Sequence, residues 1–256
     1  MHGHWQPRSL RDLQTHILPS GIETVELWFA QLSDFGSALL TMTDTCLPPE
    51  EVDRSRRISA ESVRLVYMAS CVLLRTVLST RLGIPPREIE LVRGEYGKPE
   101  LANSAGHKTL HFNLSHSGDA WLCGVSSKKP IGVDIETRDA VSNADRLALR
   151  VFSDSERAAM TALTSSDEVK THEAFLRCWT RKEAVLKAAG NGFTWTARDI
   201  HVGIERGFCS VSLPQKPGWE AGVWSFELPI TGFAAAAVLE TSISIQPQWI
   251  TTRLYP

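Results

Sequence analysis

The chain has 256 residues and a formal net charge of −2 at pH 7, a length that suffices for one large domain or two small ones. Its content of 43 % hydrophobic and 22 % charged residues is typical of a soluble globular protein. The near-neutral charge excludes a whole-protein basic field that would attract nucleic acid. No apolar run approaches the roughly 18 residues that a membrane span needs.

The amino terminus and the cysteines both bear on where the protein is located in the cell. Residues 1–20 lack the apolar core of a signal peptide. The five cysteines are odd in number and widely spaced, which favours reduced thiols over disulfides. We therefore expect a cytoplasmic protein that binds neither nucleic acid nor membranes.

Periodicity and turn residues predict mixed helix and strand in both halves of the chain. In the first half we expect an irregular arm over residues 1–21, a strand over 24–32, a helix opened by Pro48 and Pro49, a long helix over 60–81 and a strand over 110–116. A polar segment, 126–130, predicts a junction between an N-terminal half (1–128) and a C-terminal half (129–256). After it we expect strands over 132–136, 199–204, 208–213, 223–228 and 233–239, with helices beginning near 153 and running through 179–187.

Two carboxylates share one face of the strand Gly132-Val133-Asp134-Ile135-Glu136. Because side chains alternate along a strand, Val133 and Ile135 point one way and the two acids the other. Glycine at the start allows another backbone to approach closely. Neighbouring carboxylates repel unless a cation lies between them, although an exposed strand face is an equally good interpretation of this segment alone.

The helix through residues 179–187 carries a lysine where an apolar residue is expected. At about 100° per residue, Lys182 falls within the apolar stripe, while Glu183 and Lys187 lie along its edge. A buried ammonium needs a partner, and Glu156, which also forms a capping box with Ser153, is our first choice. The alternatives are a Lys182 that reaches solvent and a surface pair between Glu183 and Lys187.

Three carboxylates beside lysines suit a hard divalent cation that binds phosphates. Mg²⁺ is held by one or two carboxylates, waters and the phosphate oxygens of a substrate. Asp134, Glu136 and Glu183 are therefore candidate ligands of Mg²⁺, and Lys187 is a candidate source of fixed positive charge.

The two acidic segments together resemble the 4′-phosphopantetheinyl transferases of the larger, Sfp-type branch. The family pattern is G-[IV]-D-[IV]-E, about forty-five residues, then W-x-x-K-E-[AS]-x-x-K, and the chain has both motifs in order. The resemblance covers about residues 47–240. It implies an α+β fold of two similar halves related by a pseudo-two-fold axis, each a small, mostly antiparallel sheet packed on helices, in a monomer.

The resemblance also implies which residues contact coenzyme A. Arg64 matches an arginine on the long helix, and Arg54 is a plausible second member of the phosphate-binding group. Lys98 belongs to a Gly-Lys-Pro turn that approaches the pyrophosphate in the family. Ser115 and His116 belong to the motif F-N-[IL]-S-H-[ST], which is present in full. A solvated surface is the alternative for the two arginines and for Arg75, which lies eleven residues after Arg64 on nearly the same helical face.

The implied reaction moves the 4′-phosphopantetheine arm of coenzyme A to a serine of an apo acyl or peptidyl carrier protein and releases adenosine 3′,5′-bisphosphate. Asp134, Glu183 and Lys187 are the expected catalytic residues, with Glu183 the general base, directly or through a metal-bound water. The carrier, whether of fatty-acid, polyketide or nonribosomal-peptide synthesis, is left open. Two alternatives remain: a metal-dependent phosphohydrolase acting on coenzyme A-like pyrophosphates, and a non-catalytic relative that binds coenzyme A or a carrier.

Overall fold

A computed structural model describes residues 25–35, 38–94, 97–102, 110–127, 129–138, 144–164, 167–190, 196–227, 233–239 and 249–251. The expected N-terminal arm, 1–21, lies outside the described residues. Helices cover sheets whose strand pairs are antiparallel with one exception among the described residues. The α+β prediction is therefore confirmed.

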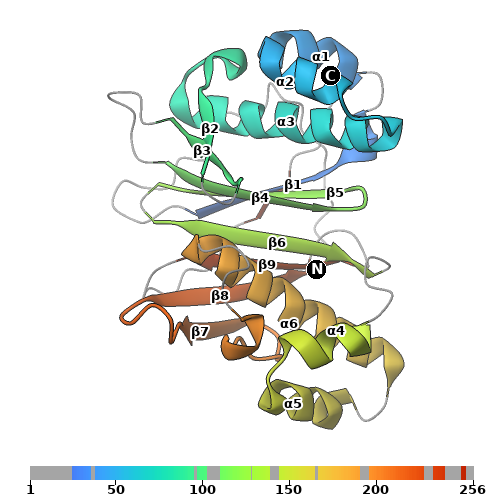
Figure 1. The fold of residues 1–256 in the computed structure, drawn as a ribbon, viewed down its shortest axis with the longest axis vertical. Helices are drawn as coiled ribbons and strands as arrows, with labels where there is room; N and C mark the ends of the chain where they lie inside the picture. The colour runs from blue at the N-terminus through green and yellow to red at the C-terminus, as the bar shows by residue number, and fades with distance from the viewer. Residues whose placement is uncertain are drawn as a thin grey trace, which may run out of the picture.

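The first sheet has the strand order β10-β1-β5-β4. Its members are β1 (Val25–Gln31), β4 (His111–Ser117), β5 (Ala120–Ser126) and β10 (Trp249–Thr251). Three helices lie over it in Figure 1: α1 (Ala38–Cys46), α2 (Pro49–Arg56) and α3 (Glu61–Leu82). β10 pairs in parallel with β1, so a segment near the end of the chain completes the sheet built by its beginning.

Short elements join these parts. A hairpin of β2 (Leu91–Arg93) and β3 (Pro99–Leu101) follows α3. Turns of 3-10 helix are η2 (Leu32–Phe35), η3 (Pro86–Glu88) and, in the second half, η6 (Ala197–Asp199).

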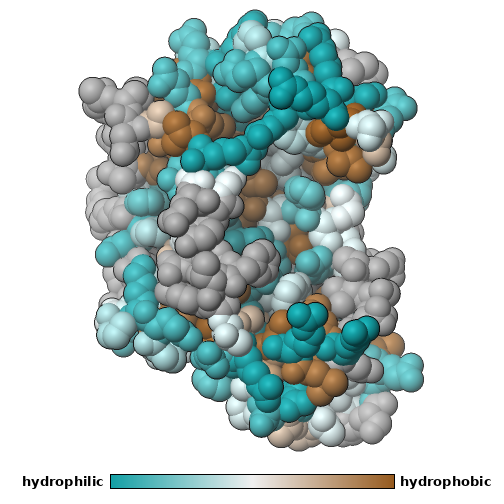
Figure 2. Space-filling view, in the orientation of Figure 1, coloured by the Kyte–Doolittle hydropathy of each residue, from teal (hydrophilic) through white to brown (hydrophobic). Residues whose placement is uncertain are grey.

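Helix α3 corrects one statement made from the sequence. By length and composition it is apolar enough to cross a membrane, and it is the one such helix in the described part of the chain. Its apolar residues, among them Val72, Leu73 and Leu78, are buried in the core that it forms with the first sheet. Figure 2 shows that the helical layers present mainly hydrophilic side chains in this view, with smaller hydrophobic patches.

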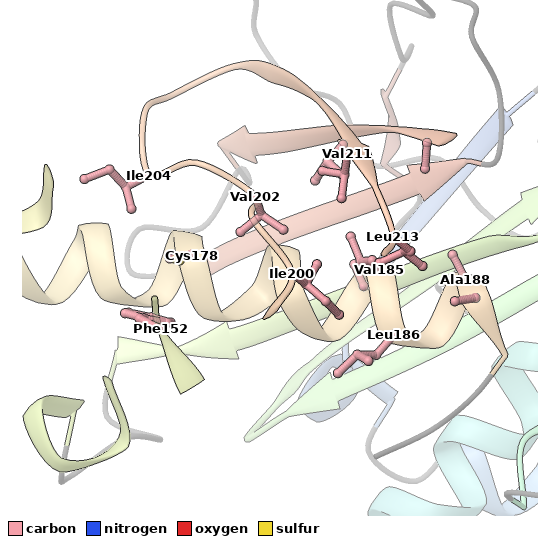
Figure 3. Close-up of a cluster of buried hydrophobic side chains, with 14 of the residues drawn as sticks. Phe152, Cys178, Val185, Leu186, Ala188, Ile200, Val202, Ile204, Val211 and Leu213 are labelled. Carbon is pink, nitrogen blue, oxygen red and sulfur yellow. The ribbon is translucent and has the colours of Figure 1, made fainter. Parts of the chain in front are cut away.

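The second sheet has the strand order β6-β9-β8-β7 and is antiparallel throughout. Its members are β6 (Ile131–Thr137), β7 (Phe208–Ser212), β8 (Glu220–Glu227) and β9 (Phe233–Leu239). The helices of this half are α4 (Ala144–Val151), α5 (Asp154–Thr164) and α6 (Glu168–Ala189). Figure 3 shows the core between them, where Cys178 and Val185 of α6 lie among Ile200, Val202 and Val211.

The two sheets pack against each other through β5 and β6. Ile131, Val133 and Ile135 of β6 are buried with Leu27 and Leu122 of the first sheet. On the other side of β6, a Cβ at Gly132 would lie 2.0 Å from the Ala184 carbonyl oxygen and 2.5 Å from the Ala188 nitrogen. The glycine therefore lets α6 lie directly on β6, as expected from the strand motif.

The halves share an order of elements. Each half begins with a strand, β1 or β6. A series of helices follows, and the last of them, α3 or α6, is 22 residues long. A hairpin, β4–β5 or β8–β9, comes after that helix. In each, the second strand of the hairpin lies between the first strand and its own hairpin partner. This order is what the predicted pseudo-two-fold relation requires, and the axis itself stays a prediction.

The strand predicted over residues 199–204 is wrong. After η6 the chain runs without regular structure, and its carbonyl groups bond to α6 instead of to a neighbouring strand. The Arg181 guanidinium donates to the carbonyls of Val202, Gly203, Glu205 and Gly207, at 2.7–3.1 Å.

Candidate functional site

The site forms where the face of β4, the free edge of β6 and the helix α6 meet. Every second residue of β4 bonds to β6: Asn113 Oδ1 accepts from the Val133 amide at 2.8 Å, Ser115 bonds to Asp134, and Ser117 bonds to Glu136. Asn113 and Ser117 accept from the Val133 and Thr137 amides, so they satisfy backbone groups at this edge of β6. The two serines also fix both acidic residues of β6 relative to the first sheet.

Asp134 is bonded on one oxygen and open on the other. Its Oδ1 accepts from Lys187 Nζ at 2.6 Å and from Ser115 Oγ at 2.8 Å, while its buried Oδ2 has no partner. Burial raises the pKa of Asp134, and Lys187 opposes that rise. The Lys187 ammonium also donates to Ser115 Oγ and to the Val133 carbonyl.

Glu183 is a buried carboxylate with an oxygen that has no hydrogen-bond partner, and its pKa is raised. The side chain is 8 % exposed, and its Oε1 is buried with no partner. Burial raises its pKa to about 7, the charges of Asp134 and Glu136 add to the rise, and Lys187 opposes it. Burial and like charge both disfavour the ionised form, so the three carboxylates lie close enough to influence one another.

The donor set fits a hard cation. Two buried carboxylate oxygens, Asp134 Oδ2 and Glu183 Oε1, lack partners, and oxygen ligands are those that Mg²⁺ prefers. Among the described residues, no three His, Cys, Asp or Glu side chains are already arranged to hold a metal ion. In this arrangement, Lys187 supplies the positive charge next to Asp134.

Lys98 and Lys187 meet although they come from different halves. Lys98 Nζ donates to the carbonyl oxygen of Lys187 at 3.2 Å. Burial lowers the pKa of Lys98, and the nearby Lys187 lowers it further. His116 follows Ser115 on β4, and its pKa is lowered by desolvation and by Lys187 and raised by Glu136. Lys187 thus contacts the acidic group directly, Lys98 lies against the Lys187 backbone, and His116 is on the face of β4 opposite to Ser115 and Ser117.

The arginines divide into one buried structural residue, Arg75, and two that are more accessible, Arg64 and Arg54. Arg75 is 2 % exposed; it forms a two-pronged pair with Glu51, both bonds at 2.9 Å, and donates to the Pro86 and Ile89 carbonyls. Its interpretation as a solvated surface residue is therefore wrong. Arg64 is half-buried, with Glu61 4.0 Å away, and Arg54 is exposed.

The predicted ion pair between Lys182 and Glu156 is confirmed. The Lys182 ammonium lies 2.8 Å from Glu156 Oε2, with both side chains buried. It also donates to the Ala197 and Ile200 carbonyls. The predicted capping box is also present, because Ser153 N–H donates to Glu156 at 2.9 Å and Ser153 Oγ accepts from the Glu156 amide.

Two residues at the site were not predicted from the sequence. Ser117 Oγ donates to Glu136 Oε2 at 2.7 Å, and Trp179 Nε1 donates to Glu136 Oε1 at 3.3 Å. Both belong to motifs quoted above. Trp179 packs against the core of the second half, and its indole N–H, which usually finds a partner when buried, is the signal in the sequence that points to it.

Acidic side chains with open oxygens lie beside the ammonium of Lys187, an arrangement that suits a cation and phosphate groups. Comparison with known sequences identifies the class. The profile of the 4′-phosphopantetheinyl transferase superfamily matches residues 130–237, and that of the 4′-phosphopantetheinyl transferase N-terminal region matches residues 28–128. The chain belongs to the 4′-phosphopantetheinyl transferases, in the Sfp-type branch.

Two relatives, HetI and Sfp, support this assignment. The 4′-phosphopantetheinyl transferase HetI of Nostoc sp. is 34 % identical over 170 residues, which are 66 % of this chain and 70 % of HetI. Sfp of Bacillus subtilis is 30 % identical over 66 % of this chain and 71 % of Sfp. AcpT of Salmonella typhimurium is 42 % identical over 53 % of this chain and 66 % of AcpT. A crystal structure of Thermotoga maritima holo-[acyl-carrier-protein] synthase overlaps 43 % of this chain and 61 % of its own, with a TM-score of 0.29 and 19 % identity.

Proposed function

We propose that this protein transfers the 4′-phosphopantetheine arm of coenzyme A to a serine hydroxyl of an apo acyl or peptidyl carrier protein. The other product is adenosine 3′,5′-bisphosphate. Membership of the family supports the reaction class. The observation that carries the proposal is the pair of buried, partnerless oxygens on Asp134 and Glu183 beside Lys187.

Asp134, Glu136 and Glu183 would hold Mg²⁺. When bound, the cation would draw charge from the pyrophosphate oxygens and offset the charge that develops on the leaving phosphate. Lys187 is already held between Ser115 and Asp134, so its ammonium is fixed before substrate arrives, as electrostatic stabilisation of a transition state requires. Lys98, whose Nζ donates to the Lys187 backbone carbonyl, is a second basic side chain close to this helix.

Glu183 is the residue best suited to accept the serine proton. Burial with neighbouring charge brings the pKa of Glu183 to about 7 in the metal-free protein, and a bound cation would lower that pKa, so Glu183 would be ionised and able to accept a proton when the cation is present. The serine oxygen forms a bond to the β-phosphorus. The bond from that phosphorus to the bridging oxygen breaks, and adenosine 3′,5′-bisphosphate departs with the electron pair.

The adenosine end of coenzyme A would meet the basic residues of the first half. Arg64, Arg54 and His116 are the proposed contacts of the phosphates there. An arginine fork matches the geometry of a phosphate dianion, and the weak pairing of Arg64 with Glu61 at 4.0 Å leaves that fork available. We further propose that the protein works as a monomer in the cytoplasm.

Intact-mass spectrometry of apo carriers tests the proposal. Each carrier is incubated with the protein, coenzyme A and Mg²⁺, beside the same carrier with its acceptor serine replaced by alanine. We expect a gain of one phosphopantetheine arm in the normal carrier alone. Cleavage of coenzyme A with every carrier unmodified would identify a phosphohydrolase instead, and binding without cleavage would identify a non-catalytic relative.

A further inference from the structure

Glu136 is held on both carboxylate oxygens, each from a different half of the protein. Ser117 Oγ, on β4 of the first sheet, donates to Oε2 at 2.7 Å. Trp179 Nε1, on α6 of the second half, donates to Oε1 at 3.3 Å. The Ser117 hydroxyl is itself oriented, because its oxygen accepts from the Thr137 amide at 3.1 Å. Its hydrogen therefore points to Glu136.

The other two acids are held differently. Asp134 has both of its hydrogen bonds on Oδ1, and its Oδ2 is without a partner; Glu183 has a buried Oε1 without a partner. Glu136 has neutral donors on both oxygens, and its charge contributes to the raised pKa values of Asp134 and Glu183, which lie nearby. Without its two donors, the flexible Glu136 side chain could turn away from these two carboxylates.

The two bonds leave Glu136 able to bind a cation. A carboxylate has about four lone-pair positions, of which Ser117 and Trp179 use two. Hydrogen bonds from surrounding residues orient carboxylates that bind metals, and their loss typically weakens metal binding or activity by about 10–100-fold.

We propose that Ser117 and Trp179 are positioning residues that keep Glu136 directed at the cation. This inference rests on the proposed function, because it takes Glu136 to face Mg²⁺. It also gives the tryptophan of W-x-x-K-E and the last residue of F-N-[IL]-S-H-[ST] a role in the reaction in addition to packing. Since the donors come from both halves, Glu136 is directed correctly only while the two sheets stay packed together.

Two variants remove one donor each. Trp179→Phe keeps an aromatic ring and removes the indole N–H. Ser117→Ala removes the hydroxyl, and Ser117→Thr restores it. Trp28→Phe is the matched control, because the Trp28 indole also donates to a carboxylate, Glu26 Oε2 at 3.2 Å, in the core of the first half. Thermal melting of each variant establishes that it is folded.

The main measurement is the binding of Mn²⁺ in the presence of coenzyme A. Mn²⁺ takes oxygen ligands as Mg²⁺ does, and the electron paramagnetic resonance signal of the free ion reports how much is unbound. We expect the Mn²⁺ dissociation constant to rise roughly 10-fold in Trp179→Phe and Ser117→Ala. It should return close to the parent value in Ser117→Thr and remain unchanged in Trp28→Phe. In the transfer assay, the Mg²⁺ concentration for half-maximal rate should rise more than kcat at saturating Mg²⁺ falls.

An unchanged dissociation constant in Trp179→Phe and Ser117→Ala would overturn the inference, and so would an equal rise in Trp28→Phe. If Trp179→Phe does not fold, the Ser117→Ala and Ser117→Thr pair decides the result alone. A parent protein that binds no Mn²⁺ with coenzyme A present also overturns it. If the parent binds Mn²⁺ and the variants show these shifts, but the parent modifies no carrier, the proposed function would be overturned and the inference would stand.

Discussion

Lys182 and Glu156 form an ion pair, 2.8 Å between Nζ and Oε2, inside the core between α6 and α5. Neither side chain is more than 5 % exposed. Removing one partner of such a pair leaves a buried charge, which typically costs ~3–5 kcal/mol. Lys182→Met should therefore lower the melting temperature by roughly 10 °C.

The matched control lies on the same helix. Lys170 is exposed and pairs with Asp167 at 3.3 Å, and exposed pairs contribute at most about 1 kcal/mol. Lys170→Met should leave the melting temperature nearly unchanged. Equal melting curves for the two variants in differential scanning calorimetry would show that Lys182 and Glu156 do not support the core.

Glu183 should destabilise the metal-free protein as pH rises. Its pKa is about 7 in the folded protein, above the ordinary 4.5, so folding favours the protonated form. The resulting stabilisation is complete below pH 4.5 and is lost as pH rises to 7, by about 3 kcal/mol in all. Glu183→Gln, which cannot ionise, should match the parent at low pH and be more stable at pH 8, while losing transfer activity.

Unfolding by denaturant at several pH values, with and without Mg²⁺, checks this prediction. The stability gap should open between pH 4.5 and 7, and Mg²⁺ should narrow it by stabilising the parent alone. A gap of the same size at pH 4 and pH 8 would mean that the Glu183 carboxylate is not perturbed.

Gly132 should tolerate no side chain, because the Cβ of an alanine would meet the α6 backbone at Ala184 and Ala188. These contacts lie beside Glu183 and Lys187, so moving α6 also moves the site. Gly132→Ala should cost about 1–3 kcal/mol or more and reduce transfer more than that loss explains.

Gly124→Ala is the comparison at the same sheet junction, since the atoms nearest to its Cβ would belong to the side chains of Val133 and Ile131 and not to the α6 backbone. Stability and transfer rates of both variants are needed. A Gly132→Ala protein that is as active as Gly124→Ala would contradict the close approach of α6 to β6.

Arg64 should hold the 3′-phosphate of coenzyme A. A hydrogen bond to a charged group contributes ~1.5–3 kcal/mol, so Arg64→Ala should weaken coenzyme A binding by about one to two powers of ten. The turnover number should fall less, because this phosphate is remote from the bond that breaks. Calorimetric titration with coenzyme A and dephospho-coenzyme A completes a double-mutant cycle. If the variant still discriminates between the two ligands as strongly as the parent, Arg64 contacts something else.

The sequence was sufficient where a pattern and its consequence lie close together. Alternation along residues 132–136 placed Asp134 and Glu136 on one face, and helical spacing found the buried Lys182. The bounds of α3 and β9 differ from the expected ones by one residue or less.

The sequence was insufficient where a distant partner decides the outcome. Residues 199–204 alternate like a strand, but their carbonyls bond to Arg181 and Lys182 of α6. Arg75 shares a helical face with Arg64, but Glu51, on the preceding helix, draws it into the core. The two hydrogen-bond donors to Glu136, Ser117 on β4 and Trp179 on α6, lie 19 and 43 residues from it in the sequence. Local periodicity carries no signal for contacts over such distances.

The most direct test of the central claim follows both products of one reaction. The protein is incubated with coenzyme A and Mg²⁺, with and without an apo carrier, and modified carrier and adenosine 3′,5′-bisphosphate are quantified together by mass spectrometry. We predict that the two products form in equal amounts, and that no adenosine 3′,5′-bisphosphate forms without a carrier. Its release at the same rate in the absence of a carrier would contradict the account, because water and not a carrier serine would then be the acceptor.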